Sequence, residues 1–144
     1  MRIQKQDKNG FEEVEICLIL PIPPSKNRMF TVRYDYNIRP RLIHTNEVRD
    51  YYEMCQSQYF GDKRINSFRN HWNKNKLIRI EITYYLKDMR RDTHGMLPVL
   101  LDALEKILQI NDRYFIVTEK ARIKSEEEKI TVSLSYEKKT EEVL

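Results

Sequence analysis

The sequence predicts a single α+β domain, a mixed α/β arrangement in which a mixed sheet of about four or more strands is covered by two main helices. Two segments, Leu77–Leu86 and Lys129–Tyr136, alternate apolar and polar residues as half-buried strands do. Apolar residues recur at helical spacing in Asn46–Phe60 and in Gly95–Leu108. A chain of 144 residues has the length of one domain with one core, so residues 1–144 are assigned to one unit with flexible tails at 1–10 and 138–144.

Further strands are expected on both sides of the first helix. Glu13–Leu20 begins as a polar/apolar alternation and becomes wholly apolar, and the prolines that follow it end the strand. Met29–Tyr34 and Arg41–His44 are suited to the two arms of a hairpin, and Tyr114–Ile123 to a later strand. The segment Gly61–Lys76 is polar and basic, and its composition predicts no definite element.

Each predicted helix has a recognisable beginning. Thr45 or Asn46 is suited to cap the first one. Pro98 must lie in the first turn of the second, where a missing N–H group costs little. The buried stripe of the second helix is expected to consist of leucines, namely Leu97, Leu100, Leu101, Leu104 and Leu108.

Composition places the protein among soluble globular chains of the cytoplasm. Hydrophobic residues make up 40% and charged residues 33% of the sequence, and no apolar run approaches the ~20 residues of a membrane span. The first ten residues lack the apolar stretch of a signal peptide, and we expect no membrane partner. Cys17 and Cys55 are isolated, which predicts two buried, reduced thiols.

Positive charge is concentrated in one half of the chain. Residues 24–91 contain 15 Lys/Arg against 7 Asp/Glu, whereas the remaining residues contain 11 against 15. A basic half suggests a polyanionic partner, most simply nucleic acid. The alternative is a solvated surface that is basic by chance.

Two carboxylates frame the second predicted helix. Asp92 follows a long strand and precedes the helix, and Asp112 follows the helix. Together they are candidates for holding a divalent cation of the kind that activates water in phosphodiester hydrolysis. His94 is two residues from Asp92 and is a candidate ligand or general acid; as a ligand it would favour Mn²⁺ over Mg²⁺. The alternatives are an acid that complements the helix dipole, a turn residue and an exposed loop histidine.

Five residues are candidates for contacting DNA phosphates. Arg90 and Arg91 precede Asp92, and guanidinium groups match phosphate geometry. Lys26, Asn27 and Arg28 follow the proline-rich stop of the first predicted strand. The alternatives are a solvated basic pair and a proline-rich turn with a polar tip. Walker, Rossmann, GxSxG and zinc-finger patterns are absent from the sequence, which argues against motors, dehydrogenases and serine hydrolases.

Two stretches resemble the motifs of the RusA family of Holliday-junction resolvases, small endonucleases of bacteria and their phages. The segment 20–27, LPIPPSKN, resembles the family's LP-x-PPS-x-N at the end of an N-terminal strand. The segments 90–95 (RRDTHG), 102–104 (DAL) and 111–113 (NDR) resemble the family's RRD-L-D-N, DAL and DD elements in order and spacing. The resemblance covers roughly residues 14–137. It implies a RusA-like fold, a homodimer, Mg²⁺ dependence and paired symmetric nicks in a four-way DNA junction.

The chain departs from the family pattern at three positions. The family's first catalytic aspartate falls on Asp92, but its second falls on His94 and its helix lysine on Pro98. The catalytic member of the final aspartate pair falls on Arg113 without a gap, or on Asp112 if the loop is one residue shorter. Losing a carboxylate and gaining a cation weakens Mg²⁺ binding.

Two functions therefore follow as hypotheses. The first is a RusA-like endonuclease of a bacterium or prophage with a rearranged site. The second is a junction-binding module on the same fold that no longer cuts. A structural protein with no nucleic-acid role is a third interpretation.

Overall fold

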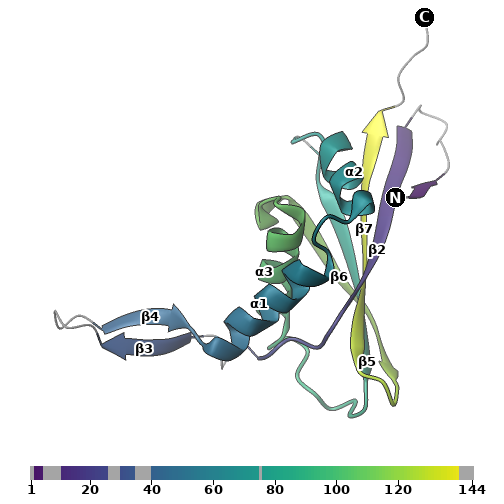
Figure 1. The fold of residues 1–144 in the computed structure, drawn as a ribbon. Coiled ribbons are helices and arrows are strands. Elements are labelled where there is room, and N and C mark those ends of the chain that lie inside the picture. Colours follow the sequence, from purple (N-terminus) through teal and green to yellow (C-terminus); the bar gives the residue numbers. More distant parts are fainter. Residues whose placement is uncertain (1, 5–10, 26–29, 35–39, 75, 140–144) are drawn as a thin grey trace, which may run out of the picture.

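The helices of the protein all lie on one face of a mixed β-sheet (Figure 1). The computed structural model describes residues 2–4, 11–25, 30–34, 40–74 and 76–139. The predicted α+β class is confirmed: five strands form the sheet and three α-helices cover it.

Strand order in the sheet is β1-β2-β7-β5-β6. The strands are β1 (Arg2–Gln4), β2 (Phe11–Leu20), β5 (Ile78–Leu86), β6 (Phe115–Lys124) and β7 (Lys129–Lys139). Antiparallel pairing joins β1 to β2, β2 to β7 and β7 to β5, whereas β5 and β6 are parallel. Parallel neighbours need a crossover connection, and the helix between them provides it.

Both segments assigned to tails contribute residues to the sheet. Arg2–Gln4 pairs with β2, and β7 continues to Lys139. Residues 1, 5–10 and 140–144 lie outside the described residues.

Within the described residues, three α-helices lie between the strands, one more than the sequence predicts. They are α1 (Asn46–Gln58), α2 (Lys63–His71) and α3 (Leu97–Leu108). In α1, Thr45 is the N-cap, and its hydroxyl accepts a hydrogen bond from the amide of Val48 at 3.4 Å. None of the described helices is both long and apolar enough to cross a membrane.

The unpredicted helix α2 falls in the polar, basic segment Gly61–Lys76. Asp62 caps it by accepting hydrogen bonds from the amides of Arg64 and Ile65. Only Ile65 and Phe68 of its nine residues are buried. Two apolar residues three positions apart are a weak periodic signal, which is why the pattern in the sequence did not indicate a helix.

The predicted hairpin is present as β3 (Phe30–Tyr34) and β4 (Pro40–His44), which pair antiparallel. It projects away from the sheet beyond the first turn of α1 (Figure 1). The loop that joins its arms, residues 35–39, lies outside the described residues.

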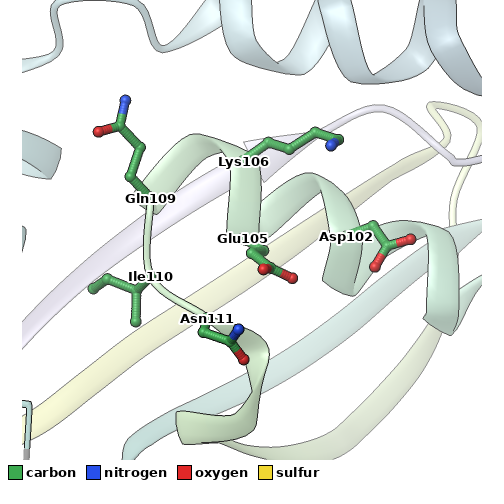
Figure 2. Close-up of a pocket in the computed structure, with 6 residues that line it drawn as sticks. All are labelled: Asp102, Glu105, Lys106, Gln109, Ile110 and Asn111. Carbon is green, nitrogen blue, oxygen red and sulfur yellow. The ribbon is translucent and has the colours of Figure 1, made fainter.

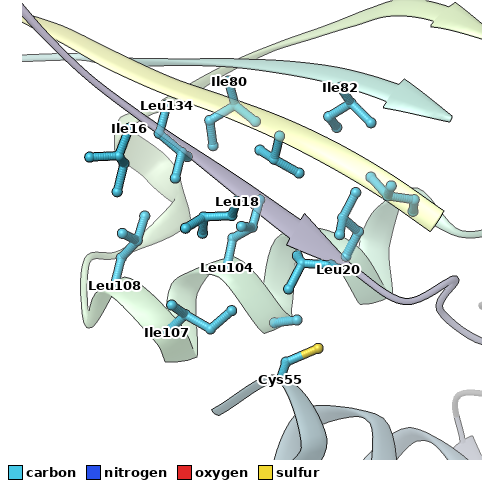
Figure 3. Packing of buried hydrophobic residues seen from close by; sticks show 14 of the residues in the cluster. Ile16, Leu18, Leu20, Cys55, Ile80, Ile82, Leu104, Ile107, Leu108 and Leu134 are labelled. Atoms are coloured by element: carbon cyan, nitrogen blue, oxygen red, sulfur yellow. The ribbon is translucent and has the colours of Figure 1, made fainter. Parts of the chain in front are cut away.

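The core fills the space between the sheet and α3 (Figure 3). Burying one such aliphatic side chain contributes about 1.5–3 kcal/mol to folding. Strands β2, β5 and β7 turn alternate residues inward, as their sequence patterns predict. The labelled core residues are Ile16, Leu18, Leu20, Cys55, Ile80, Ile82, Leu104, Ile107, Leu108 and Leu134.

Two details of the predicted burial need correction. Leu97 and Leu101 are only partly buried, because the face of α3 that meets the sheet is rotated toward residues such as Val99, Ala103 and Ile107. Cys17 is exposed and only Cys55 is buried. Cys17 lies between the inward-facing residues Ile16 and Leu18 of β2. Its side chain therefore lies on the opposite face of the sheet, which none of the described helices covers.

A β-bulge interrupts the parallel pair. Ile82 is paired with Glu119 and Thr83 with Ala121, so Lys120 is an extra residue in β6. The bulge shifts the alternation by one position. As a result Glu119 and Arg122, three residues apart, lie opposite the inward residues Ile82 and Tyr84.

Candidate functional site

Asp92 occupies a tight turn between β5 and α3. Its Oδ1 atom accepts a hydrogen bond from the amide of Gly95 at 3.1 Å. A Cβ atom at Gly95 would lie 2.9 Å from Oδ2 of Asp92 and 3.2 Å from Oγ of Ser25. Any larger residue at this position would force the Asp92 side chain to shift. Two sequence motifs about 65 residues apart, the PPS segment and the RRDTHG segment, therefore meet here.

The same turn is fixed to the sheet by Arg122 of β6. The Arg122 guanidinium donates hydrogen bonds to the Thr93 hydroxyl at 2.7 Å and to the carbonyl oxygen of Arg91 at 3.1 Å. Thr93 is fully buried, so the bond satisfies a hydroxyl that has no access to water. Arg122 thus positions the loop that carries Asp92, and nothing in the local sequence indicates this role.

The two predicted phosphate-binding arginines of this loop each contact a carboxylate. Arg90 pairs with Asp88 at 3.2 Å, and its hydrogen bonds to that carboxylate lower the pKa of Asp88. Arg91 pairs with Glu128 at 3.0 Å. The Arg90 side chain is 91% exposed, so it remains accessible to a polyanion. The other predicted phosphate contacts, Lys26, Asn27 and Arg28, lie outside the described residues.

His94 lies beside a carboxylate that the sequence did not single out. Its Nδ1 atom is 3.6 Å from Oε2 of Glu119, and the imidazole is largely exposed. The Tyr84 hydroxyl donates to Oε1 of the same carboxylate at 3.0 Å. Burial and the neighbouring Glu119 raise the pKa of Tyr84, which keeps the phenol protonated as a donor.

Asp112 lies in a second group of acidic side chains, on the solvent-facing side of α3. One oxygen each of Asp102, Glu105 and Asp112 lie within 4.8 Å of one another. Figure 2 shows the Glu105 carboxylate near Asn111, in the segment that follows α3, and Asp102 on an earlier turn of the same helix. Three carboxylates at this separation repel one another, and a bound cation would relieve the repulsion.

The end of α3 is what brings Asp112 back to the helix. Gln109 adopts the left-handed conformation (φ 57°), and its amide donates to the carbonyl oxygen of Glu105 at 2.8 Å. The chain then reverses through the short 3-10 helix η2 (Asp112–Tyr114), which Asn111 caps. This reversal places the Asp112 carboxylate beside the second turn of α3.

Neighbouring side chains complete the acidic group. The Tyr52 hydroxyl of α1 donates to Oδ2 of Asp102 at 3.0 Å. Burial, followed by the charge of Asp102, raises the pKa of Tyr52. Lys106 lies 5.0 Å from the centre of the Tyr52 ring, and with Asp102 and Glu105 it lines an open cavity of about 440 Å³.

The donor set suits a hard divalent cation. All three side chains offer oxygen, the ligand that Mg²⁺ and Ca²⁺ prefer, and two oxygens on one Mg²⁺ ion are separated by roughly 3–4 Å. Arg113, the residue on which the resemblance places an aspartate, donates instead to the Tyr114 hydroxyl at 2.8 Å and stacks on that ring. The Arg113 guanidinium therefore interacts with Tyr114.

The structure thus distributes the predicted site residues over two places. Asp112 joins Asp102 and Glu105, whereas Asp92 and His94 are not members of this group. Asp102 and Glu105 were assigned no role from the sequence, although their spacing of three places both on one helix face. The pattern in the sequence does not show that the chain reverses after α3 and brings Asp112 back to that face.

Comparisons with known proteins identify no family. No protein-family model matches the chain, and no curated protein matches it significantly. Among solved structures, it is similar to 2C-methyl-D-erythritol 2,4-cyclodiphosphate synthase from Plasmodium vivax, with 10% sequence identity and a TM-score of 0.33. That match covers 89% of this chain and 97% of the other. A similarity of this size carries no argument about function.

Proposed function

We propose that this protein is a metal-dependent endonuclease of a bacterial cytoplasm or prophage that nicks branched DNA. The observation that carries the proposal is the group formed by Asp102, Glu105 and Asp112, whose oxygens lie within 4.8 Å of one another. Asp102 and Asp112 both belong to the segment that resembles the RusA family of Holliday-junction resolvases. The meeting of Ser25 with the Asp92 turn supports the same resemblance, because its two motifs lie side by side.

In this proposal the three grouped carboxylates hold Mg²⁺, with Mn²⁺ as the alternative. A divalent cation at a phosphodiester supplies charge relief to the phosphate and lowers the pKa of a bound water. Asp102 is oriented for ligation by the Tyr52 hydroxyl, which occupies Oδ2. Asp92 and His94 are proposed as catalytic residues on the loop before α3, where the His94 imidazole is largely exposed and lies beside Glu119.

Positive side chains on the same loop are proposed to bind the DNA backbone. Arg90 extends into solvent, and Arg91 would exchange its Glu128 partner for a phosphate. Lys26, Asn27 and Arg28 follow Ser25 in the sequence and are assigned the same role. A homodimer would present two such sites to the two strands of a four-way junction.

The test is the incubation of the protein with a labelled four-way junction in Mg²⁺ or Mn²⁺. We expect paired nicks from the wild type, and a loss of at least about a hundredfold in Asp112→Asn or Asp92→Asn, as removal of a group acting on the transition state produces. Glu126→Gln is the matched control, because this exposed carboxylate lies in the β6–β7 turn outside the acidic group. Absence of nicking by the wild type, or equal nicking by Asp112→Asn, contradicts the proposal.

A junction-binding module that does not cut is the second candidate function. It is favoured by His94 and Arg113, which replace carboxylates of the family pattern. Such a module would bind the junction with a strong salt dependence and show no metal-dependent cleavage. Titration with Mn²⁺ separates the candidates, because only the enzyme requires a cation at Asp112.

A further inference from the structure

A separate pocket lies where the three helices meet, and its lining differs from that of the acidic group. It has a volume of about 310 Å³ and receives side chains from α1, α2 and α3. This volume is at the lower end of the range for pockets that bind small organic groups. Its polar and aromatic lining includes Gln56, Phe60, Asn66, Arg69, Lys106 and Gln109.

The charge and chemistry of this lining favour an anionic, planar ligand. Among the described residues that line the pocket none is acidic, although the chain contains 22 Asp and Glu. Arg69 from α2 and Lys106 from α3 supply two positive charges. Three carboxamides are also present, and side-chain amides can both donate to and accept from the edge of a nucleobase.

Phe60 gives the pocket an exposed aromatic face. It lies in the turn between α1 and α2 and is 92% exposed, the highest value among the large hydrophobic residues described as exposed. Gly61 follows it in the left-handed conformation (φ 71°) and shapes this turn. An exposed ring next to cations is the arrangement on which single-stranded nucleic acids stack their bases.

We propose that this pocket, named here the Phe60 pocket and comprising the lining residues given above, binds an unpaired nucleotide of a DNA strand. The base stacks on Phe60, the carboxamides meet its edge, and Arg69 and Lys106 meet the flanking phosphates. Lys106 and Gln109, both labelled in Figure 2, also line the cavity beside the acidic group, so the two sites adjoin across the last turn of α3. The inference rests on the proposed function for the choice of DNA as the ligand. It does not depend on the proposed cleavage, because binding in this pocket needs no metal.

The test is fluorescence anisotropy with labelled oligothymidylate and a blunt duplex, both in EDTA. Phe60→Ala should weaken oligothymidylate binding by about 5- to 150-fold, the range seen when one stacking ring is removed, and leave duplex binding unchanged. Arg69→Gln should reduce the slope of log K against log salt by about 0.7, as for one lost phosphate contact on a single strand. Met54→Ala is the matched control, because it removes an exposed apolar side chain of α1 that lies outside the pocket.

The outcomes separate this inference from the proposed cleavage. Circular dichroism should show Phe60→Ala to be folded, since its ring makes little contact with the rest of the protein. If Phe60→Ala binds oligothymidylate as tightly as Met54→Ala, the pocket is not a nucleotide site. Displacement of the oligonucleotide by polyglutamate but not by thymidine monophosphate would assign the pocket to an acidic peptide and overturn the inference. If the wild type binds oligothymidylate through Phe60 and never nicks a junction, the cleavage proposal fails and this one stands.

Discussion

Removing the charge of Asp112 should stabilise the metal-free protein. Oxygens of Asp102, Glu105 and Asp112 lie within 4.8 Å of one another, so each carboxylate repels two neighbours. At 4.8 Å, the upper bound on these separations, and at the dielectric constant of water, which suits an exposed group, each pair costs about 0.9 kcal/mol. Asp112→Asn should therefore raise the free energy of unfolding by about 2 kcal/mol at low ionic strength, and by about 1 kcal/mol at physiological salt, where the Debye length is ~8 Å.

A divalent cation should reverse the order of stability. The wild type gains about 2.7 kcal/mol when the free cation is a hundredfold above its dissociation constant, because the cation binds only the folded state. Asp112→Asn should gain much less, since the variant retains two of the three ligands. Urea denaturation in EDTA and in MgCl₂ measures both changes.

Glu126→Gln is the control for the general effect of removing one negative charge. It should change the stability little in either buffer, because Glu126 is exposed and outside the acidic group. The electrostatic argument is refuted if Asp112→Asn and Glu126→Gln have equal stability in EDTA at low salt. Equal stabilisation of wild type and Asp112→Asn by Mg²⁺ and by Mn²⁺ would refute the metal assignment.

Three further changes have definite expected results. Gly95→Ala places a Cβ atom 2.9 Å from Oδ2 of Asp92 and should lower the free energy of unfolding by about 1–3 kcal/mol in chemical denaturation. Gly61→Ala is the control, because its Cβ atom meets no atom within 4 Å and the substitution is strained only by the φ of 71°. Ellman's reagent should modify one thiol per folded chain and two in denaturant, because Cys17 is exposed whereas burial raises the pKa of Cys55 to about 11; two fast thiols in the folded protein would contradict the packing of α1. Burial raises the pKa of Tyr136 from 10.0 to about 12, so the unfolded chain loses this proton first and the free energy of unfolding falls as the pH rises from 10 to 12. Across that window, the free energy of unfolding of Tyr136→Phe should fall by up to about 2.7 kcal/mol less than that of the wild type, as measured by denaturation at several pH values.

Four of the five described sheet strands and two of the helices could be predicted because their signals are local, whereas β1 falls in a segment that was assigned to a tail. Alternation in Leu77–Leu86 and Lys129–Tyr136 reflects which face of each strand is buried, and the Thr45 cap of α1 and the proline in the first turn of α3 are short-range features. Helix α2 escaped prediction because its burial depends on contacts of Ile65 and Phe68 with distant segments. The ring of Phe68, for example, packs edge-on against Tyr136 at a centroid distance of 4.7 Å.

The candidate site was predictable only in part, because its geometry depends on the folded chain. Asp92 and Asp112 stand out as exposed acids next to helix ends, but their partners do not. Asp102 and Glu105 have the pattern of a solvated helix face until Gln109 reverses the chain. Similarly, Arg122 reaches the Asp92 turn only because a bulge at Lys120 changes its direction, and no sequence pattern predicts a bulge there.

The position of β7 also governs the order in which the sheet can form during synthesis. This strand, the last of the described elements, lies between β2 and β5 and pairs with both. Until residues 129–139 leave the ribosome, the strands already made remain as separate pieces, β1 with β2 and β5 with β6. Joining Phe11 to Lys139 closes a long loop, so folding of the sheet is expected to be slow and to wait until β7 has been synthesised. Before β7 is made, the edges of β2 and β5 that it later covers are exposed. These edges are the sites at which a chaperone would bind.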